Sequence, residues 1–377
     1  MEFFDHEIKK LGFGLMRLPQ KDGAIDVEQV KEMVDRFLAA GFTYFDTAWA
    51  YQGSEDAIRQ ALVERYPRES FQLATKNAAW LGCRTRKKAI RQFEESLART
   101  GAGYFDNYLL HNLGESRTHF FDDFDMWNFV LEKKAEGKIR HVGFSFHSTP
   151  EELEQILTAH PEIEFVQLQI NYADWENPAV QSRAVYETAR KFGKPVIVME
   201  PVKGGLLANP PASVKRILLE AEPERSAASW GIRFAADLDG VLAVLSGMSS
   251  VAQMEDNISY MKDFAGLSDA QRTTLAEARA ALNAIPLVPC TKCDYCAKVC
   301  PKGIGISGTF TAKNLYTLYG DLEAAKKEES WKVGDHGLLQ AVNCIRCGSC
   351  ERVCPQHISI REELKAAAEL FGQTPQG

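Results

Sequence analysis

Eight of the nine cysteines stand in two copies of one pattern near the C-terminal end of the chain. Each copy reads C-x-x-C-x-x-C-x-x-x-C-P, over residues 290–301 and 344–355. Thiolates at this spacing are typical ligands of 4Fe–4S clusters. The first three cysteines of a copy bind one cluster, and the fourth binds the other. The pattern therefore predicts two clusters and chemistry that moves single electrons.

This rule gives each cluster ligands from both copies. The two predicted sets are Cys290, Cys293, Cys296 and Cys354 for cluster 1, and Cys344, Cys347, Cys350 and Cys300 for cluster 2. Zinc is one alternative, but it would favour four ligands in two C-x-x-C pairs. Disulfides are the other, and they are disfavoured by the odd number of cysteines and by the lack of a secretory segment.

Composition and charge narrow the class of protein. The 377 residues allow one large domain and a small one, and the net charge of −7 gives no basic bias toward nucleic acid. The first residues, MEFFDHEIKKLGFG, lack the apolar region of a signal peptide. No apolar run of about 18 residues is present, so we expect no membrane span. Thiolate-bound clusters require a reducing compartment, which predicts a cytoplasmic protein.

Residues 11–262 alternate short β-rich runs with longer helical patterns. The expected strands are Gly12–Leu18, Thr43–Asp46, Phe71–Lys76, Asn107–His111, His141–Ser145, Phe165–Ile170, Pro195–Met199 and Val241–Leu245. Expected helices include Val27–Ala40, Lys87–Thr100, Phe124–Glu136 and Ala179–Phe192. This α/β alternation predicts a (β/α)8 TIM barrel. A doubly wound Rossmann sheet is the alternative, but it would require a G-x-G-x-x-G turn after the first strand.

The expected domains follow from these patterns. We assign residues 1–262 to the barrel, 263–287 to a polar helical connector, 288–371 to the 4Fe–4S domain and 372–377 to a loose tail. The segment FTAKNLYTLYGDLEAAKKEES between the cysteine copies has helical composition, and it resembles the α-helical kind of ferredoxin module.

Four side chains that could transfer a proton are expected at one rim of the barrel, where strands end. Asp46 and Lys76 end the second and third strands, Tyr51 follows Asp46, and His111 ends the fourth strand. An ammonium beside a phenol favours the phenolate and lowers the phenol's pKa. The carboxylate would hold the ammonium, and the histidine could polarise a carbonyl oxygen. The set is suited to protonating an oxygen while hydride reaches carbon.

The segment FDTAWAYQGSEDAIRQAL resembles the D-T-A-x-x-Y-G-x-S-E signature of the aldo/keto reductase family. That family's Asp, Tyr, Lys and His tetrad falls on the four rim residues. With the cysteine copies appended, the chain resembles the ferredoxin-fused branch of the family. The resemblance implies a (β/α)8 barrel, oxidoreductase chemistry on a carbonyl or alcohol, and NAD(P)H. It also implies cofactor contacts from Ser145, Gln167, Gly204, Gly205, Leu206, Ser246, Gly247, Met248, Gln253 and Asn257.

The residues expected to contact the cofactor depart from the family pattern. Phe146 follows Ser145 where the family has Asn, and Met199 stands where an aromatic residue usually stacks on the nicotinamide. Gly247 and Gln253 occupy places that often hold basic residues. The loss of cationic contacts argues against strong selection for NADP. The remaining glycine turns suit the phosphate of NAD(P)H and equally that of FMN.

Nicotinamide delivers two electrons as hydride, whereas each cluster accepts one, and a flavin is the usual converter. We therefore expect clusters that relay electrons between the barrel cofactor and an external carrier of the ferredoxin or flavodoxin kind. One alternative is a plain NAD(P)H-dependent carbonyl reductase with structural clusters. The other is a non-enzymatic electron-transfer or redox-sensing protein. The residues leave open the substrate, the reaction direction and the oligomeric state.

Overall fold

The structure, a computed structural model, describes residues 8–114, 116–177 and 180–374. Its residues fall into two compact units: one of residues 1–208 and 222–275, and one of residues 209–221 and 276–377. The grouping of residues 209–221 with the C-terminal residues was not expected from the sequence. The division at residues 262, 287 and 371 stays a prediction. Within the described residues no helix has the length and apolar character needed to cross a membrane.

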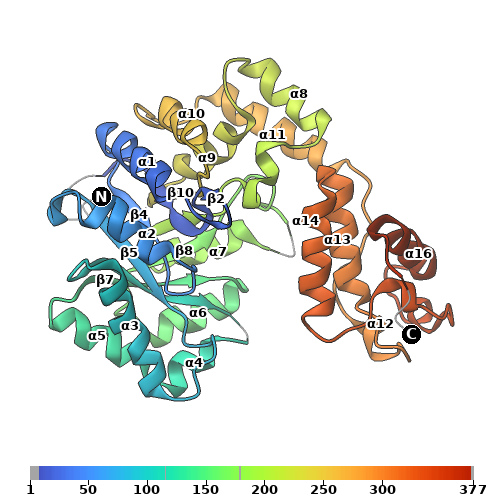
Figure 1. Cartoon of the computed structure of the whole chain (residues 1–377). Helices are drawn as coiled ribbons and strands as arrows, with labels where there is room; N and C mark the ends of the chain where they lie inside the picture. The colour runs from blue at the N-terminus through green and yellow to red at the C-terminus, as the bar shows by residue number, and fades with distance from the viewer. Residues whose placement is uncertain (1–7, 115, 178–179, 375–377) are drawn as a thin grey trace. The chain divides into compact units, whose positions relative to one another are not determined.

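The first unit is built on a closed barrel of eight strands, in the order β1-β10-β9-β8-β7-β6-β5-β4. Every pair in the barrel is parallel. The barrel prediction is confirmed, and the doubly wound alternative is wrong. The strands are β1 Leu11–Gly14, β4 Tyr44–Asp46, β5 Gln72–Asn77, β6 Phe105–Leu113, β7 Ile139–Phe146, β8 Phe165–Gln169, β9 Val196–Met199 and β10 Val241–Ser246 (Figure 1).

The first strand is shorter than expected. It ends at Gly14, the last residue paired with β4, and Leu15–Arg17 form a 3-10 turn. The prediction that the strand reaches Leu18 is therefore wrong. The error matters because it moves Arg17 from a strand interior to the loops at the end of the barrel. A small antiparallel hairpin, β2 Gln20–Lys21 with β3 Ala24–Ile25, follows this turn.

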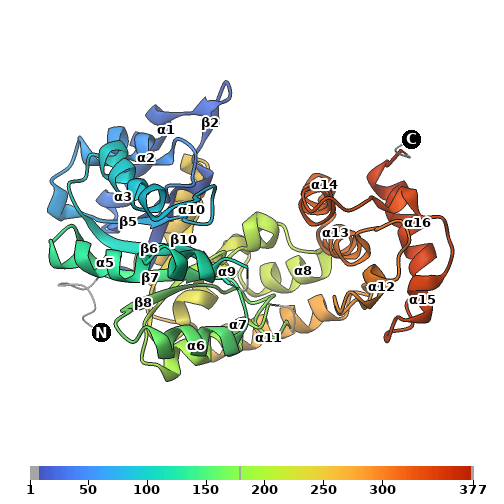
Figure 2. The same cartoon turned by 90° about the horizontal axis from the view of Figure 1, so that it is seen from below.

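Helices surround the strands, as Figures 1 and 2 show. They are α1 Val27–Ala39, α2 Ser54–Ile58, α3 Arg86–Thr100, α4 Thr118–Asp123, α5 Met126–Ala135, α6 Pro150–Ala159, α7 Ser182–Lys191, α9 Ala227–Asp237 and α10 Val251–Met261. Asp26 caps α1 by accepting a bond from the backbone N of Gln29 at 3.1 Å. The expected start of the seventh helix at Ala179 lies outside the described residues, and α7 begins at Ser182.

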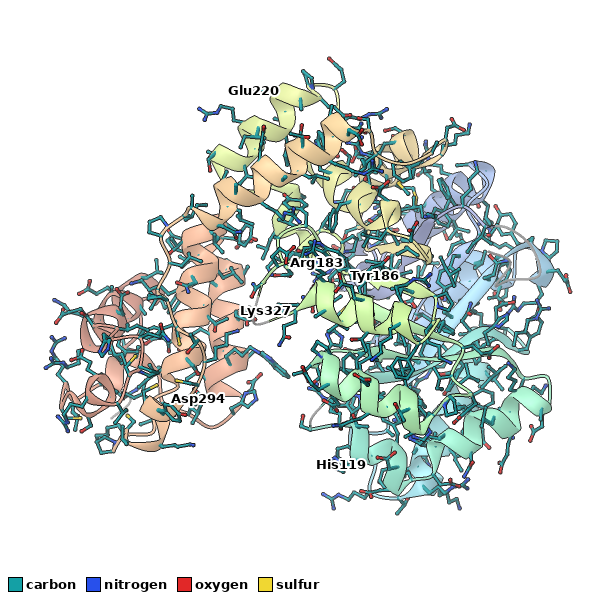
Figure 3. All side chains as sticks on the ribbon, turned by 180° about the vertical axis from the view of Figure 1, so that it is seen from behind. His119, Arg183, Tyr186, Glu220, Asp294 and Lys327 are labelled. Atoms are coloured by element: carbon teal, nitrogen blue, oxygen red, sulfur yellow. The ribbon has the colours of Figure 1, made fainter. Side chains whose placement is uncertain are left out.

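The helices contact the barrel mainly through apolar side chains, with a few hydrogen bonds between them. Tyr186 on α7, labelled in Figure 3, lies with its ring centroid 5.6 Å from that of Trp175. Its hydroxyl donates to the backbone carbonyl of Asp239 at 2.7 Å, which joins α7 to the turn before β10. The phenol can be buried there because its polar end has a partner.

The inside of the barrel is closed by side chains that alternate along the strands. This layer consists of Tyr44, Ala74, Leu109, Phe165, Ile197, Ala243 and Leu245, all buried. Gly143 on β7 makes room for it, since a Cβ there would lie 2.6 Å from the Phe165 ring. The layer forms a floor, and the next inward-facing residues stand above it toward the carboxyl ends of the strands.

The second unit is helical, as expected. It holds α8 Ala212–Ala221, the residues of α11 Asp269–Asn283 from Ala276 on, α12 Tyr295–Lys298, α13 Ile306–Tyr319, α14 Leu322–Glu329, α15 Ser349–Arg352 and α16 Ile360–Phe371. Its core contains cysteines among aliphatic residues: Cys296 and Cys350 are buried with Ile304, Ile306 and Leu364. The cysteine segments are therefore the centre of this unit.

Candidate active site and cluster pockets

The two-residue period of the strands places four polar side chains in the layer directly above the floor of the barrel. Asp46 lies two residues beyond Tyr44, Lys76 beyond Ala74, His111 beyond Leu109 and Gln167 beyond Phe165. Because side chains two apart share a face of a strand, all four project into the barrel one layer above the floor. The structure thus brings together three of the four predicted catalytic residues by the geometry of neighbouring strands.

Asp46 and Lys76 form a buried ion pair. Lys76 Nζ donates to Asp46 Oδ1 at 2.5 Å and to the backbone carbonyl of Thr47 at 2.7 Å. Gln167 Nε2 donates to Asp46 Oδ2 at 3.0 Å. Burial acts to lower the pKa of Lys76, but Asp46 and Tyr51 outweigh it and raise that pKa. The ammonium is therefore charged and held in one place.

Tyr51 reaches the site from the loop after β4. Lys76 Nζ lies 4.9 Å from the centroid of the Tyr51 ring. Burial raises the pKa of the phenol, and Lys76 opposes this rise without cancelling it. The net direction differs from the lowering that the sequence analysis expected, because desolvation of the phenolate exceeds its attraction to the ammonium. Tyr51 is consequently a protonated donor at neutral pH.

His111 faces Tyr51 across the site. The two ring centroids are 5.7 Å apart with the rings edge to face. Burial, reinforced by Lys76, holds the pKa of His111 well below its usual range, so the imidazole is neutral. Its Nδ1 is buried and has no hydrogen-bond partner among the residues described. Trp80 adjoins it, donating from Nε1 to the His111 carbonyl at 2.8 Å. A neutral imidazole can donate a hydrogen bond from one of its ring nitrogens to a substrate oxygen.

Two glycine turns and an arginine meet at another part of the rim. Gly204 and Gly205 follow β9 with φ of 67° and 103°, a conformation that favours glycine. The Arg17 side chain lies against both this turn and the one after β10. A Cβ on Gly204 would lie 3.2 Å from Arg17 Nη2, and one on Gly247 would lie 3.4 Å from Arg17 Cδ.

Arg17 was not among the site residues expected from the sequence, because the first strand was expected to continue to Leu18. The short G-F-G-L-M-R segment could have indicated a loop cation after a short strand. Ser249 Oγ donates to the Arg17 carbonyl at 2.7 Å, which anchors this loop to the last βα turn. The exposed guanidinium therefore supplies positive charge where Gly247 and Gln253 supply none.

The other predicted cofactor residues occupy varied environments. Ser145 Oγ accepts a bond from the backbone N of Asn112 at 2.7 Å. Ser246 and Asn257 are buried and bonded to each other, Nδ2 to Oγ, at 2.6 Å. Met248 packs in the main core, so its side chain faces away from solvent. The remaining two are accessible: Leu206 is half-buried, and Gln253, which is exposed, accepts from the backbone N of Ser249 at 2.7 Å. Their role in cofactor binding stays a prediction.

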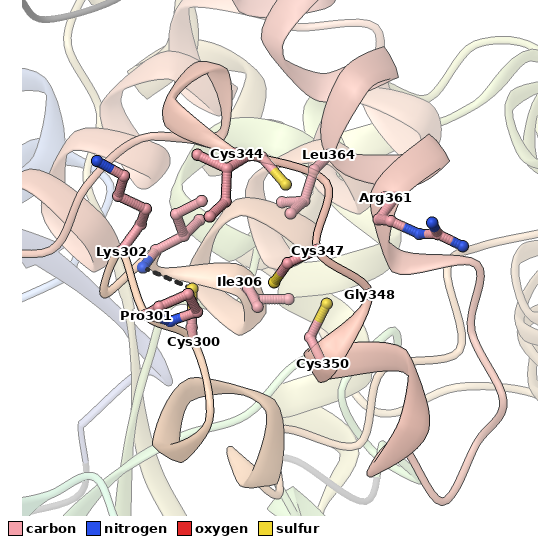
Figure 4. Close-up of a pocket in the computed structure, with 12 residues that line it drawn as sticks. Cys300, Pro301, Lys302, Ile306, Cys344, Cys347, Gly348, Cys350, Arg361 and Leu364 are labelled. Atoms are coloured by element: carbon pink, nitrogen blue, oxygen red, sulfur yellow. Dashed lines mark hydrogen bonds between the residues drawn. The ribbon is translucent and has the colours of Figure 1, made fainter.

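The cysteines of the second unit line two separate pockets. One is lined by Cys300, Cys344, Cys347 and Cys350 (Figure 4). The other is lined by Cys290, Cys293, Cys296 and Cys354. Each pocket thus gathers three cysteines of one copy and the fourth of the other, which is the crossed arrangement expected from the spacing.

The sulfur atoms surround these spaces without converging on one point. All nine cysteines are free of disulfides. Within the described residues no three Cys, His, Asp or Glu side chains are close enough to hold one metal ion. Backbone N–H groups point at two of the sulfurs, from Ile304 to Cys300 Sγ at 3.5 Å and from Arg346 to Cys344 Sγ at 3.4 Å. Such a ring of thiols with N–H donors fits a 4Fe–4S cube.

A model of the Aldo/keto reductase family matches residues 10–280. The chain belongs to the aldo/keto reductase family. A model of the 4Fe-4S dicluster domain matches residues 289–359, which contain the two cysteine copies. The protein is accordingly an aldo/keto reductase with a C-terminal 4Fe-4S dicluster domain, and an oxidoreductase.

Curated relatives of this aldo/keto reductase are distant. An uncharacterised oxidoreductase of Schizosaccharomyces pombe is 26% identical over 267 residues, which cover 67% of this chain and 82% of the relative. An aldo-keto reductase of Mycolicibacterium smegmatis is 25% identical over 209 residues, covering 54% of this chain and 68% of the relative. A 9,11-endoperoxide prostaglandin H2 reductase of Trypanosoma cruzi is 26% identical over 200 residues, covering 52% and 62%.

Solved structures show the same fold. The aldo-keto reductase AKR11C1 of Bacillus halodurans, in its holo form, has a TM-score of 0.57 at 24% identity, covering 73% of this chain and 94% of its own. An aldo-keto reductase of Klebsiella pneumoniae in complex with NADPH has a TM-score of 0.58 at 21% identity, covering 72% and 90%. The likeness covers the barrel-sized part of this aldo/keto reductase.

Proposed function

We propose that this aldo/keto reductase interconverts a carbonyl and an alcohol on a small molecule in its barrel. We further propose that two 4Fe–4S clusters relay electrons between the barrel cofactor and an external one-electron carrier. The observation that supports the barrel chemistry is the arrangement of Tyr51, Lys76 and His111 above a closed floor. The crossed cysteine sets in two pockets support the second part.

In the proposed reaction the substrate oxygen binds between Tyr51 and His111. Neutral His111 binds and orients the oxygen, and the protonated Tyr51 phenol donates a proton to it as the carbonyl is reduced. The Lys76 ammonium stabilises the phenolate that remains, and Asp46 keeps the ammonium in position. In the reverse direction the phenolate accepts the proton of the alcohol.

The rim residues fit a phosphate-bearing cofactor, which we propose is NAD(P)H. When bound there, a reduced nicotinamide would provide hydride chemistry for the substrate carbon. Arg17 and the turns at Gly204 and Gly247 would hold its phosphates, since a guanidinium and backbone N–H groups both favour anions. Gln167 and Ser145 are near enough to the tetrad strands to orient the ring. FMN is the alternative, and the relay requires it: a flavin accepts hydride and releases single electrons to the clusters, which nicotinamide alone does not. The same corner suits the FMN phosphate.

The cysteine pockets fit two cubes, cluster 1 in the pocket of Cys290 and cluster 2 in the pocket of Cys300. When bound, such clusters transfer single electrons. The protein side would supply the four thiolates of each set and N–H bonds to sulfur from Ile304 and Arg346, which make reduction easier by stabilising added negative charge.

The test uses protein purified without oxygen. First, denaturation and fluorescence of the supernatant would reveal released flavin and so decide between the two barrel cofactors. Second, aldehyde reduction by NADPH is compared with turnover driven by a reduced ferredoxin. Tyr51→Phe should abolish both activities while leaving the cluster spectrum unchanged. Cys347→Ala should remove cluster 2 and abolish only the ferredoxin-driven turnover. Unchanged ferredoxin-driven turnover in Cys347→Ala would contradict the relay.

A further inference from the structure

The two cluster pockets differ in the side chains at their mouths. Around the cluster 2 pocket stand Lys302, Ile345 and Arg361. The cluster 1 pocket has Asp294, Thr291 and Gln356 in the comparable lining. Figure 4 shows Lys302 and Arg361 on opposite sides of the four cysteines in that view, and Figure 3 labels Asp294 at the turn before α12. The lining of the cluster 2 pocket therefore carries basic and apolar side chains. The lining of the cluster 1 pocket carries one acidic and two uncharged polar side chains, and the exposed Lys292 lies next to Thr291 in the chain.

The apolar part of the cluster 2 mouth is open to solvent. Ile345, next to the ligand Cys344, is 57% exposed. Cys347, another ligand of the same set, is exposed, as is Cys293 of the cluster 1 set. The hydrophobic side chains that line the cluster 1 pocket, Ile306, Phe310, Ile358 and Ile360, are all buried, so the exposed ligand there has no exposed aliphatic residue in the lining. A single exposed aliphatic side chain is common on protein surfaces. What distinguishes Ile345 is its place in the lining of a cluster pocket, next to Cys344.

The charge around this apolar residue is positive. Lys302 is exposed and has no acidic partner among the residues described. Arg361 is partly neutralised, because it pairs with Glu351 at 2.8 Å. Lys302 is thus the free charge at the mouth, in a chain whose net charge is −7. An apolar centre with a basic edge is complementary to a negatively charged protein surface.

We propose that the mouth of the cluster 2 pocket, formed by Lys302, Ile345 and Arg361, is the docking surface for an acidic one-electron carrier protein. This docking surface rests on the proposed relay. It identifies the place where electrons would pass between cluster 2 and the external carrier. Ile345 would pack against the carrier, and Lys302 would attract carboxylates around the carrier's own redox centre. The cluster 1 pocket, whose lining carries Asp294 and no cation, would attract the same partner less.

The experiment measures binding alone, so it is independent of catalysis. The probe is an acidic [2Fe–2S] ferredoxin with gallium in place of iron, which cannot exchange electrons, and the full-length protein carries its clusters. Titration calorimetry gives Kd for the wild type, Lys302→Glu, Ile345→Ser and Lys292→Glu. The last is the matched control, since Lys292 is an exposed lysine of the first cysteine copy with the same change of charge. Iron content and the visible spectrum establish that each variant keeps both clusters.

We expect Lys302→Glu to raise Kd roughly tenfold at low ionic strength, with the difference shrinking as salt is added. Ile345→Ser should raise Kd about fivefold at every salt concentration, because its contribution is apolar. Lys292→Glu should change Kd less than about twofold. Equal weakening by Lys292→Glu and Lys302→Glu would overturn the proposal, as would the absence of binding to wild type.

A second measurement separates this proposal from the proposed relay. Native reduced ferredoxin is mixed with wild type and Lys302→Glu, and bleaching of the protein's clusters is followed. Cluster reduction at equal rates in both proteins would overturn the docking surface and leave the relay standing. The expected binding pattern without any cluster reduction would leave the docking surface standing and contradict the relay.

Discussion

Replacing Lys76 by methionine tests whether the buried pair is held by charge. The Lys76 side chain is 0% exposed and that of Asp46 is 4% exposed, so the loss of the ammonium leaves a carboxylate that water cannot reach. Only the bond from Gln167 at 3.0 Å would remain to it. Breaking a buried pair on one side costs about 3–5 kcal/mol. For a domain of this size that corresponds to a fall of roughly 6–20 °C in Tm.

The double variant Asp46→Asn with Lys76→Met provides the control. It removes both charges, and the amide oxygen of the new asparagine can still accept from Gln167. We expect it to recover stability to within about 2 kcal/mol of wild type, because an uncharged pair has little desolvation penalty. Activity should stay lost by about 10²–10⁴-fold in both variants, since the phenolate of Tyr51 has lost its cation.

Urea unfolding followed by tryptophan fluorescence gives the free energies, and aldehyde reduction gives the rates. The reasoning would be refuted if single and double variants lost the same stability, because the two charges would then not be coupled. Recovery of activity in the double variant would refute the catalytic part separately.

Three further predictions concern the remaining site residues. Because burial raises the pKa of Tyr51 and lowers that of His111, carbonyl reduction should be independent of pH from about pH 6 to pH 9; a transition near neutrality that disappears in His111→Asn would contradict this. Arg17→Ala should raise the Kd of NADPH by about 10- to 100-fold, measured by fluorescence titration, as expected for a lost charged hydrogen bond; an unchanged Kd would remove Arg17 from the cofactor site. Cys300→Ser and Cys347→Ser, although in different cysteine copies, should each remove the same half of the iron and the same paramagnetic signal; loss of different signals would contradict the crossed ligand sets.

The patterns that could be read from the sequence are local ones. The strand period of two puts Asp46 above Tyr44 and Lys76 above Ala74 wherever the barrel forms, so these residues were identified before their contacts were known. The cysteine spacing likewise predicts that each cluster takes three ligands from one copy and the fourth from the other. The short segments in each copy leave the fourth thiol pointing away from the first three. The barrel itself followed from eight alternating strands and helices, and it is confirmed.

Tertiary structure decided what depends on distant segments meeting. Closure of the barrel pairs β1 with β10, the first strand with the last, and this alone sets Arg17 against the turns at Gly204 and Gly247. The direction of the shift in the Tyr51 pKa also depends on the fold. Burial raises this pKa and the Lys76 ammonium lowers it, and the sequence does not give the relative size of the two effects. The different side chains that line the two cluster pockets emerged in the same way. They depend on which loop residues line each pocket, and spacing determines only the cysteines.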